Sequence, residues 1–475
     1  MMEITWVVGA CLSTLLVILL TSWIFGGRQG ALPPGSLGLP LIGEILELMI
    51  PSYSLDLIPF LKKRIQRFGK IFKTRVAGRV IVVLSDTTLC RYVFQQDGKL
   101  FEPRSLDTFS KVFAQEATNV SDVHRYVRSL VLKHFGMEAL KQKLLNQLEV
   151  EFRAAIRSWS QQESVDIKYA SGTMALEFGA KKLFSYDPKQ SSLKLGEVYF
   201  SLTKGLMAIP LNIPGTTHYK CLQNRKKAMS MIREIFKKRR ASPEKRPQEE
   251  LDLLDHLIAD MESDKSFLTE ELAVQLLFNL PFVSFDSVST TLCLTLKFLA
   301  EHPRALQELI DEHEAIRKNR EGSESPITWE EYKSMSFTIH LINEVLRLGN
   351  ISPGLFRRTK TVVDMNGYKI PAGWGIMIAT SALHMDPEIY EDPTTFNPWR
   401  WKDCKSEAMV KNLMPFGWGM KQCAGAEYSR VFLATFLHVL VTGYRWKVLK
   451  GGQVCRSPML SLGQGMHIKF MQKDI

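Results

Sequence analysis

The sequence lacks the cysteine patterns that define disulfide frameworks and zinc sites. Its 7 cysteines are odd in number and scattered, and they include no C-x-x-C pair. No compact arginine-rich run with interleaved aromatic residues is present, which argues against a nucleic-acid partner. No glycine fingerprint for a flavin or a nicotinamide stands in a strand-to-helix context. We therefore expect a protein that faces a reducing compartment and receives any electrons it needs from another protein.

What the chain has is a globular composition and an excess of positive charge. Hydrophobic residues make up 45% and charged residues 23% of its 475 residues, so a large core can be buried. Length alone allows two or three ordinary domains or one large, mainly helical domain. The formal net charge of +12 suits an anionic membrane surface or an acidic protein partner.

An uncharged apolar stretch over residues 4–25 predicts an N-terminal transmembrane helix. About 22 residues at about 1.5 Å each give a helix of roughly 33 Å, enough to cross a bilayer core. The alternative is a cleaved signal peptide, whose apolar region is normally about 7–15 residues long. A proline- and glycine-rich segment follows, so we predict an anchor over residues 1–26, a semi-rigid hinge over 27–50 and a folded body over 51–475.

Hydrophobic periodicity predicts a mainly α protein with a small β portion (α+β). Helical patterns cover residues 55–68, 139–159, 202–240, 269–300, 303–320 and 428–440. β-branched runs on either side of Ala77 and Gly78 predict a hairpin over residues 71–84. The apolar, proline-containing stretch 209–215 has two interpretations, a membrane-dipping segment or an interhelical loop packed on the core.

One cysteine stands in a glycine-punctuated loop that leads into an apolar helical pattern. Within residues 415–425, Gly417, Gly419 and Gly425 permit backbone conformations and close approach that a side chain would forbid. A helix that begins near Gly425 directs N–H groups and partial positive charge at its N-terminus, which would stabilise a thiolate on Cys423. Taken alone, a lone cysteine is more often a buried free thiol beside a turn.

The spacing F-x-x-G-x-x-x-C-x-G, formed by Phe416, Gly419, Cys423 and Gly425, resembles the haem-ligand loop of the cytochrome P-450 family. The resemblance implies the cytochrome P-450 fold and a haem b cofactor (iron protoporphyrin IX), with Cys423 as the axial thiolate and metal ligand. A thiolate pushes electron density onto the iron and favours O–O cleavage. Lys421 stands where the family usually has an arginine, and its expected role is to neutralise a propionate without the bidentate fork of arginine.

Further residues match haem-binding positions of the family. His124 and Arg128 are four residues apart on a predicted helix, where the family has H-x-x-x-R or W-x-x-x-R. The resemblance implies that Arg128 binds a propionate with support from His124. Arg357, with Arg358 as the alternative, fits the strand that lines the substrate cavity and points an arginine to a propionate. Trp418 stands where the family commonly has a small residue, and the sequence predicts no role for it.

An acid and a hydroxyl occur in the middle of the long apolar helix. Asp286 and Ser287 resemble the end of the family's oxygen-binding motif A/G-G-x-D/E-T, which implies that they handle protons for iron-bound oxygen. Val283 and Ser284 replace the usual small pair. Serine keeps a donor and an acceptor but lacks the methyl group that stiffens threonine. The alternative is a helix kink in which the serine is satisfied by its own helix.

Glu344 and Arg347 lie one helical turn apart and can contact one another. Most such pairs lie on a surface and contribute little. Here they resemble the family's E-x-x-R motif, and Arg400 lies in a segment that resembles its second motif. The resemblance implies a buried Glu344–Arg347–Arg400 network that braces the loop below the haem. Breaking one member would leave a buried charge unpaired, at a cost of about 3–5 kcal/mol.

Together the motifs imply a membrane-anchored haem-thiolate monooxygenase, with residues 51–475 as its catalytic domain. The expected reaction inserts one atom of O2 into a C–H bond of a large apolar substrate, with electrons from NADPH-cytochrome P-450 reductase. The segments 32–36, 212–216, 327–332 and 396–401 resemble the plant steroid and triterpenoid branch, which favours a triterpenoid, for example of cucurbitane type, or a steroid. The expected location is the endoplasmic reticulum membrane, with a single span and the catalytic domain on the cytosolic side.

Two alternatives remain open at this point. One is rearrangement or dehydration of a hydroperoxide at the same haem-thiolate site without O2 or reductase, which the altered stretch 283–287 permits. The other is a membrane-tethered haem or sterol carrier without catalysis. A carrier would use the Glu344 network equally well, but it has no use for Asp286 and Ser287 over the iron.

Overall fold

The structure is a computed structural model of the chain. It describes residues 32–40, 42–104, 120–206, 211–241, 251–263, 267–320, 325–402, 407–463 and 465–473, together with the single positions 14, 208, 247 and 322. Apart from Thr14, the predicted membrane anchor over residues 4–25 lies outside the described residues.

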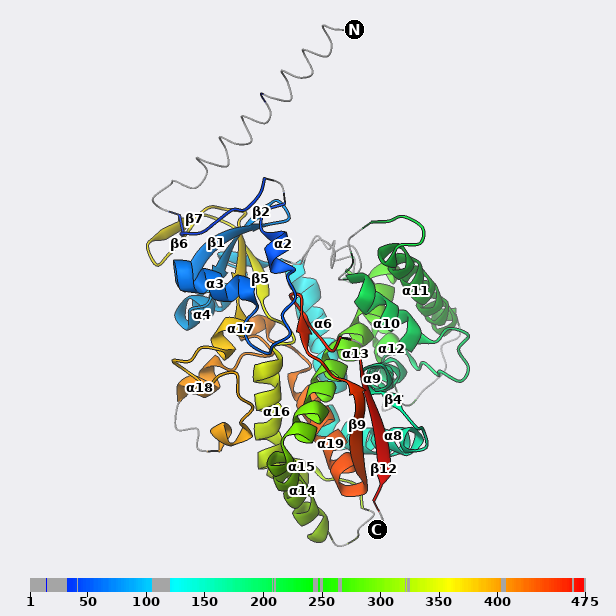
Figure 1. The fold of residues 1–475 in the computed structure, drawn as a ribbon. Coiled ribbons are helices and arrows are strands. Elements are labelled where there is room, and N and C mark those ends of the chain that lie inside the picture. Colours follow the sequence, from blue (N-terminus) through cyan, green and yellow to red (C-terminus); the bar gives the residue numbers. More distant parts are fainter. Residues whose placement is uncertain are drawn as a thin grey trace.

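One long helix, α13 (Glu270–Glu301), runs through the middle of the molecule, and other helices pack around it (Figure 1). It begins where the Thr269 side chain accepts a hydrogen bond from the N–H of Leu272, and acidic residues occupy its first turn. Among the described residues it is also the one helix long and apolar enough to cross a membrane, but 61% of its apolar window is buried inside the protein. This burial identifies α13 as the core helix predicted over residues 269–300.

The other predicted helices are present with shifted bounds. The pattern over 55–68 begins as a helix only at Pro59, because proline suits the first helical position, where its missing N–H costs nothing. These helices and helical turns are α2 (Ile45–Leu48), α3 (Pro59–Phe68), α4 (Thr87–Gln95), α6 (Val120–Phe135), α7 (Met137–Ala139), the π-helical turn η1 (Leu140–Leu144), α8 (Leu145–Ser160), α9 (Ile167–Phe184), α10 (Leu195–Leu206), α11 (Thr217–Ala241), α12 (Leu253–Met261), α14 (Pro303–Lys318), α15 (Trp329–Ser334), α16 (Ser336–Gly349), α17 (Thr380–His384), the 3-10 turns η3 (Pro398–Trp401) and η4 (Gly419–Lys421), α18 (Glu407–Asn412) and α19 (Ala426–Gly443).

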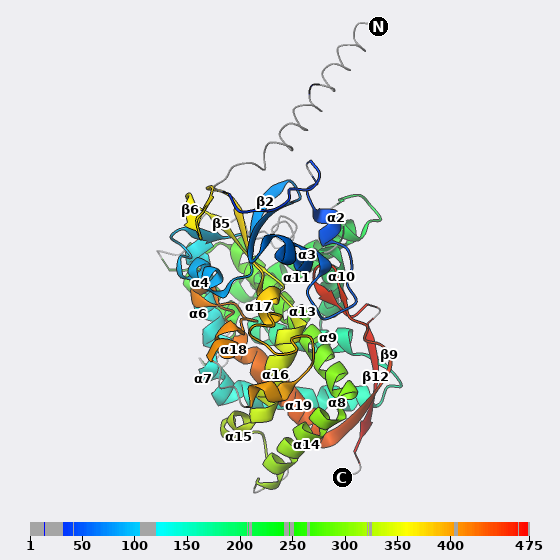
Figure 2. The ribbon, with the colours of Figure 1, turned by 60° about the vertical axis from the view of Figure 1, so that its left-hand side comes forward.

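Small sheets form the β portion at the edges of the helical body (Figures 1 and 2). The strands are β1 (Ile71–Val76), β2 (Arg79–Leu84), β3 (Phe101–Pro103), β4 (Val165–Asp166), β5 (Leu355–Thr359), β6 (Val363–Met365), β7 (Tyr368–Ile370), β8 (Gly375–Ile378), β9 (Tyr444–Gly451), β10 (Cys455–Arg456), β11 (Leu460–Ser461) and β12 (Met466–Gln472). The largest sheet has the order β1-β2-β8-β5-β3, in which only β2 and β8 are parallel. The predicted hairpin is confirmed as β1 and β2, and its turn places Ala77 and Gly78 at φ 50° and 76°.

The described part of the predicted hinge is packed onto the body. The backbone of Gly35 forms a bridge with Lys73 at the edge of β1. Glu44 accepts hydrogen bonds from Ser36 Oγ at 2.7 Å and from Arg64 Nε and Nη2 at 3.0 and 2.6 Å. Glu44 and Arg64 are both buried. The proline-rich segment is therefore fixed to α3 and the sheet through contacts that its composition does not encode.

The main core lies where α9 crosses α13. A Cβ at Gly172 of α9 would lie only 3.0 Å from the Phe285 ring, so the small residue permits the close approach of the two helices. Tyr199 of α10 is fully buried and donates to the carbonyl of Phe278 at 2.7 Å. These contacts fix the middle of α13, which carries Asp286 and Ser287.

Candidate active site

The loop between α18 and α19 presents Cys423 on a series of tight turns. Gly417 and Gly419 both have φ of 72°, a region that other residues rarely adopt. The N–H of Cys423 donates to the carbonyl of Phe416 at 2.9 Å, which closes the loop around η4. Gly425 is the N-cap of α19 with an ordinary φ of −90°, and a Cβ there would lie 3.9 Å from Cys423 Sγ, in normal contact. The backbone conformation therefore requires glycine at Gly417 and Gly419, while the conformation at Gly425 is one that other residues adopt.

Cys423 is an exposed residue. Burial raises the pKa of Cys423, while the N–H of Gly425 and the charge of Arg128 act to lower it. Arg128 comes from α6, and its Nη1 donates to the carbonyl of Gln422, so this cation is tied directly to the cysteine loop. A coordinating metal ion would remove the remaining proton outright.

Basic side chains from three elements converge beside this loop. His124 and Arg128 lie on α6, Lys421 on η4 and Arg357 on β5. Burial lowers the pKa of His124, and the charges of three nearby cations act in the same direction: Lys421, Arg128 and Arg357. Burial also lowers the pKa of Lys421, and Asp97 opposes this shift. The predicted propionate-binding residues thus share one electrostatic neighbourhood suited to carboxylates.

Arg357 is held by an acid that the sequence did not single out. Its Nε and Nη2 donate to the two carboxylate oxygens of Asp97, both at 2.8 Å, and its Nη1 donates to the carbonyl of Phe356 at 3.0 Å. Both side chains of the ion pair are buried. Arg358 instead points outward, with 50% of its side chain exposed, and pairs with Glu102. The structure therefore places Arg357, rather than Arg358, on the inner side of β5.

The middle of α13 presents an open face. Val283 is 58% exposed although it lies within the core helix, and Ser287 is one turn further along. The Ser287 hydroxyl donates to the carbonyl of Val283 at 2.5 Å, as in the self-satisfied alternative, yet α13 continues unbroken through Pro281. The Asp286 carboxylate is turned away toward α9, where it accepts from Lys168 Nζ at 2.9 Å. Ser287 therefore lies on the open face while Asp286 is held beside it.

The carboxylate of Glu344 contacts both Arg347 and Arg400. Arg347 Nε and Nη2 donate to the Glu344 carboxylate at 3.0 and 2.7 Å, and Arg400 Nε donates to the same group at 3.0 Å. Arg347 also donates to the carbonyls of His384 at 2.9 Å and Pro393 at 2.6 Å. These bonds tie α16 to the segment that precedes the cysteine loop.

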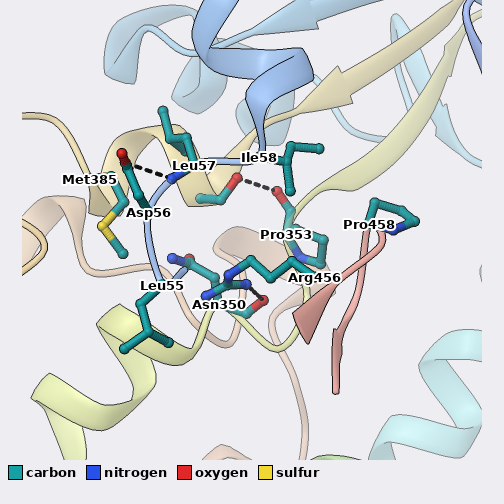
Figure 3. A pocket seen from close by; sticks show the side chains of 10 residues that line it. Leu55, Asp56, Leu57, Ile58, Asn350, Pro353, Met385, Arg456 and Pro458 are labelled. Atoms are coloured by element: carbon teal, nitrogen blue, oxygen red, sulfur yellow. Dashed lines mark hydrogen bonds between the residues drawn. The ribbon is translucent and has the colours of Figure 1, made fainter. Parts of the chain in front are cut away.

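Two cavities lie away from the cysteine loop. Figure 3 shows the smaller, of about 10 Å³, beside Arg456, Asn350 and Pro353, which has room for about one water molecule. The guanidinium of Arg456 donates to the carbonyls of Leu348 and Gly349 at the end of α16, so this residue caps a helix. The larger is a groove of about 410 Å³ beside Trp446 of β9. The residues that line these two cavities include none of the predicted site residues.

An accessible cysteine beside a helix N-terminus, with clustered cations and a long core helix, is the arrangement of a haem-thiolate protein. The family described as Cytochrome P450 matches residues 33–472, and this chain belongs to the cytochrome P450 family. It is a cytochrome P450 monooxygenase, so the carrier alternative is not retained. The family implies a haem-thiolate cofactor, an electron-transfer partner and an apolar substrate.

Two plant enzymes are each 46% identical to the chain. One is cucurbitadienol 11-hydroxylase of Siraitia grosvenorii, matched over 99% of this chain and 100% of the relative. The other is beta-amyrin 16-alpha-hydroxylase of Maesa lanceolata, with the same coverage. Among solved structures, a retinoic acid-bound cyanobacterial cytochrome P450 matches with a TM-score of 0.79 and 24% identity, covering 93% of this chain and 99% of that one. This last likeness supports the mainly helical fold with small sheets, and the fold alone.

The described residues fit the haem group that the family implies. The donor set contains an accessible thiol for the iron and basic side chains for the propionate carboxylates. The open face of α13 presents the exposed apolar side chain of Val283, and Ser287 supplies a hydroxyl one helical turn away. Sequence reasoning missed Asp97 and Lys168, the acid and the base that hold Arg357 and Asp286.

Proposed function

We propose that this chain hydroxylates a triterpenoid, or a steroid of similar size, at an unactivated C–H bond. The observation that carries this proposal is the 46% identity, over 99% of the chain, to two hydroxylases named for cucurbitadienol and beta-amyrin. Both names denote large apolar polycyclic substrates, which suits the exposed apolar side chain of Val283 on the open face of α13. The proposal specifies the class of substrate and the type of reaction, and it names neither the individual substrate nor the carbon that is oxidised.

In this proposal Cys423 binds the iron of haem b, and the basic side chains of Arg128, His124, Arg357 and Lys421 hold the two propionates. Their shared electrostatic neighbourhood supports the assignment. Haem, when bound, supplies the binding and reduction of O2 and the transfer of one oxygen atom to the substrate. The protein's own task is to hold that group and the substrate in register.

Ser287 and Asp286 are proposed to move protons at the open face of α13. The Ser287 hydroxyl already stands on that face, where it can accept a proton from solvent and donate one inward. Asp286 can join it only if its carboxylate leaves Lys168, because the ion pair at 2.9 Å holds it toward α9. Proton transfer from Asp286 therefore includes a rotation of that side chain.

We further propose a single-span protein of the endoplasmic reticulum membrane, with residues 1–26 as anchor, 27–50 as connecting segment and 51–475 as cytosolic catalytic domain. NADPH-cytochrome P450 reductase would supply the electrons. Large apolar side chains are exposed on α2, the segment after it and the stretch 211–216, which lie at the same end of the molecule (Figures 1 and 2). They are Leu46 at 65%, Ile50 at 52%, Tyr53 at 66% and Ile213 at 56%. Exposed apolar side chains at one end of the molecule suit contact with lipid.

The test is reconstitution of the full chain with the reductase, NADPH and a panel that includes cucurbitadienol and beta-amyrin. Mass spectrometry under labelled O2 should show a product with one labelled oxygen atom, and omission of the reductase or NADPH should abolish it. A product that forms from a hydroperoxide without reductase would instead favour the rearrangement alternative. No oxidised product from any triterpenoid or steroid, in a preparation with a thiolate-type carbon monoxide spectrum, would contradict the proposed substrate class.

A further inference from the structure

The guanidinium of Arg357 donates hydrogen bonds to a carboxylate along one of its two edges. Asp97 takes the side-on edge, formed by Nε and Nη2, with two bonds of 2.8 Å. Phe356 accepts one further bond from Nη1. Because a guanidinium has five N–H groups, one N–H on Nη1 and one on Nη2 are left, and these form the end-on edge. In the described part of the chain no other acceptor contacts that edge.

The same guanidinium lies over the ring of Phe94, which is one of two neighbouring aromatic side chains inclined at 53° to one another. The Arg357 guanidinium carbon is 5.7 Å from the centre of the Phe94 ring. The Phe94 ring in turn packs against Trp418, with ring centres 6.3 Å apart. Phe94 belongs to α4, whereas Trp418 directly precedes η4 in the cysteine loop. This pair of rings therefore joins the loop that carries Cys423 to the strand that carries Arg357.

We infer that Asp97 and Trp418 are positioning residues that hold Arg357 with its end-on edge directed at a haem propionate. Asp97 fixes the guanidinium by two hydrogen bonds, and Phe94, against which Trp418 packs, supplies a cation–π contact on another side of it. This inference rests on the proposed haem site. It also gives a role to Trp418, the residue for which the sequence offered none.

The other residue proposed to bind a propionate beside the cysteine, Lys421, shows why the positioning of Arg357 matters in this chain. Lys421 replaces the usual arginine beside the cysteine and offers a point charge without a planar fork. Arg357 can bind a carboxylate through two parallel N–H groups, as Arg128 can, and it differs from Arg128 in being held by a buried carboxylate. A buried, doubly bonded Asp97 fixes that fork before the cofactor arrives, so less conformational freedom is lost on binding.

The test measures release of ferric haem from the full-length holoprotein to an excess of a haem-scavenging apoprotein. Asp97→Asn removes the charge that holds the side-on edge but keeps the shape of the side chain. We expect haem release to become about tenfold faster, the loss that corresponds to one charge-assisted hydrogen bond. Trp418→Ala removes the ring that packs against Phe94 at a partly exposed position, and we expect release to become about threefold faster.

A double-mutant comparison separates positioning from general stabilisation. Arg357→Lys should itself speed haem release, and adding Asp97→Asn to it should change the rate by less than about twofold, because the group that Asp97 holds is gone. The propionate bending bands in the resonance Raman spectrum should shift in Asp97→Asn. A residue that only stabilises the fold would leave these bands unmoved.

The chain offers a matched control in Glu44, which grips Arg64 by the same Nε and Nη2 edge in another buried pair. Glu44→Gln should lower thermal stability but leave haem release unchanged. Equal release rates for Asp97→Asn and the wild type, or equal acceleration by Glu44→Gln, would overturn the inference. If Asp97→Asn does not fold, an unchanged rate in Trp418→Ala overturns it instead. Haem retention is measured without substrate, so failure to oxidise triterpenoids would affect the proposed function and leave this inference standing.

Discussion

The carboxylate of Glu344 forms a two-point ion pair with the guanidinium of Arg347 one helical turn away, and neither side chain has any exposed surface. The same carboxylate accepts from Trp401 Nε1 at 3.0 Å and from the N–H of Asn397 at 3.1 Å. Every direction in which Glu344 can accept a bond is thus used by groups near the cysteine loop. A buried charge that is satisfied in this way is costly to leave without its partner.

We therefore expect Glu344→Gln to lower the free energy of unfolding by about 3–5 kcal/mol. Urea denaturation followed by circular dichroism would measure it. The matched control is Glu330→Gln, which removes a pair of the same spacing with Lys333 on the surface of α15. Glu330→Gln should lower the free energy of unfolding by less than about 1 kcal/mol. Equal effects of the two substitutions would contradict the buried network as a source of stability.

The hydroxyl of Ser287 is expected to matter for proton transfer. Ser287→Ala should lower the share of NADPH electrons recovered in product by at least about tenfold, with the balance released as peroxide, because a positioned proton donor is lost from the open face. Parallel assays of NADPH consumption, product and hydrogen peroxide would show it. Ser289→Ala is the control, since Ser289 is a fully buried serine of the same helix that also bonds its own backbone. Equal losses of coupling in both variants would mean that Ser287 has only a structural role.

Two buried histidines share a hydrogen bond between their Nδ1 atoms at 3.0 Å, His313 on α14 and His438 on α19. Arg320 Nη2 donates to His438 Nε2 at 3.2 Å, so His438 must carry its proton on Nδ1 and donate to His313. His313 then donates from Nε2 to the hydroxyl of Thr338 at 3.0 Å. The chain of bonds requires both imidazoles to be neutral.

This arrangement predicts a loss of stability in acid. Burial lowers the pKa of His438 to about 3, and the nearby charge of Arg320 acts in the same direction. Burial, together with the charge of Arg347, likewise lowers the pKa of His384 to about 3. The unfolded chain binds protons at these histidines below about pH 6.5, while the folded chain does not, so stability is complete above that pH and falls as the pH drops toward 3.

The expected slope is about 1.4 kcal/mol per pH unit for each of these histidines below about pH 6.5. Urea denaturation between about pH 7.5 and about pH 5 would measure it in the wild type. His438→Gln removes one titrating group, and its stability should fall less steeply over the same range. Parallel pH profiles of the two proteins would show that His438 is not held neutral by the fold.

Lys421, two residues before Cys423, gives a prediction about the rate of haem release, in which one substitution should slow the release. Lys421→Arg should slow haem release by a fewfold, because a guanidinium fork can bind a carboxylate through two N–H groups. Lys421→Met should speed it by about tenfold, since the charge is lost while most of the side-chain length is kept. The scavenger assay measures both. A faster release from Lys421→Arg than from the wild type would show that the site has no room for the fork.

Local patterns predicted most of the fold. The turn at Ala77 and Gly78 and the long core helix are both present, because each depends on residues close together in sequence. The docking of the segment after the predicted anchor was not predicted. It depends on the Glu44–Arg64 pair, whose members are 20 positions apart and have no pattern that marks them as partners.

The same distinction applies to the site. The cysteine loop and the E-x-x-R pair could be identified because their spacing is short. Asp97 could not, because its partner Arg357 lies 260 positions away and a lone acid before glycine is typical of an ordinary turn. The lysine that holds Asp286 is 118 positions from it, on a helix with no motif of its own. Contacts between residues this far apart in the sequence can be identified only from the three-dimensional structure.

The most direct test of the whole account is the carbon monoxide difference spectrum of the reduced full-length protein with Cys423→Ala and Cys423→His. The wild type should show the spectrum of a thiolate-ligated haem, and both variants should lose it while circular dichroism shows an unchanged helical fold. Cys455→Ala, at another cysteine that is not fully buried, should keep it. A thiolate-type spectrum that persists in either Cys423 variant would contradict the assignment of Cys423 as the iron ligand.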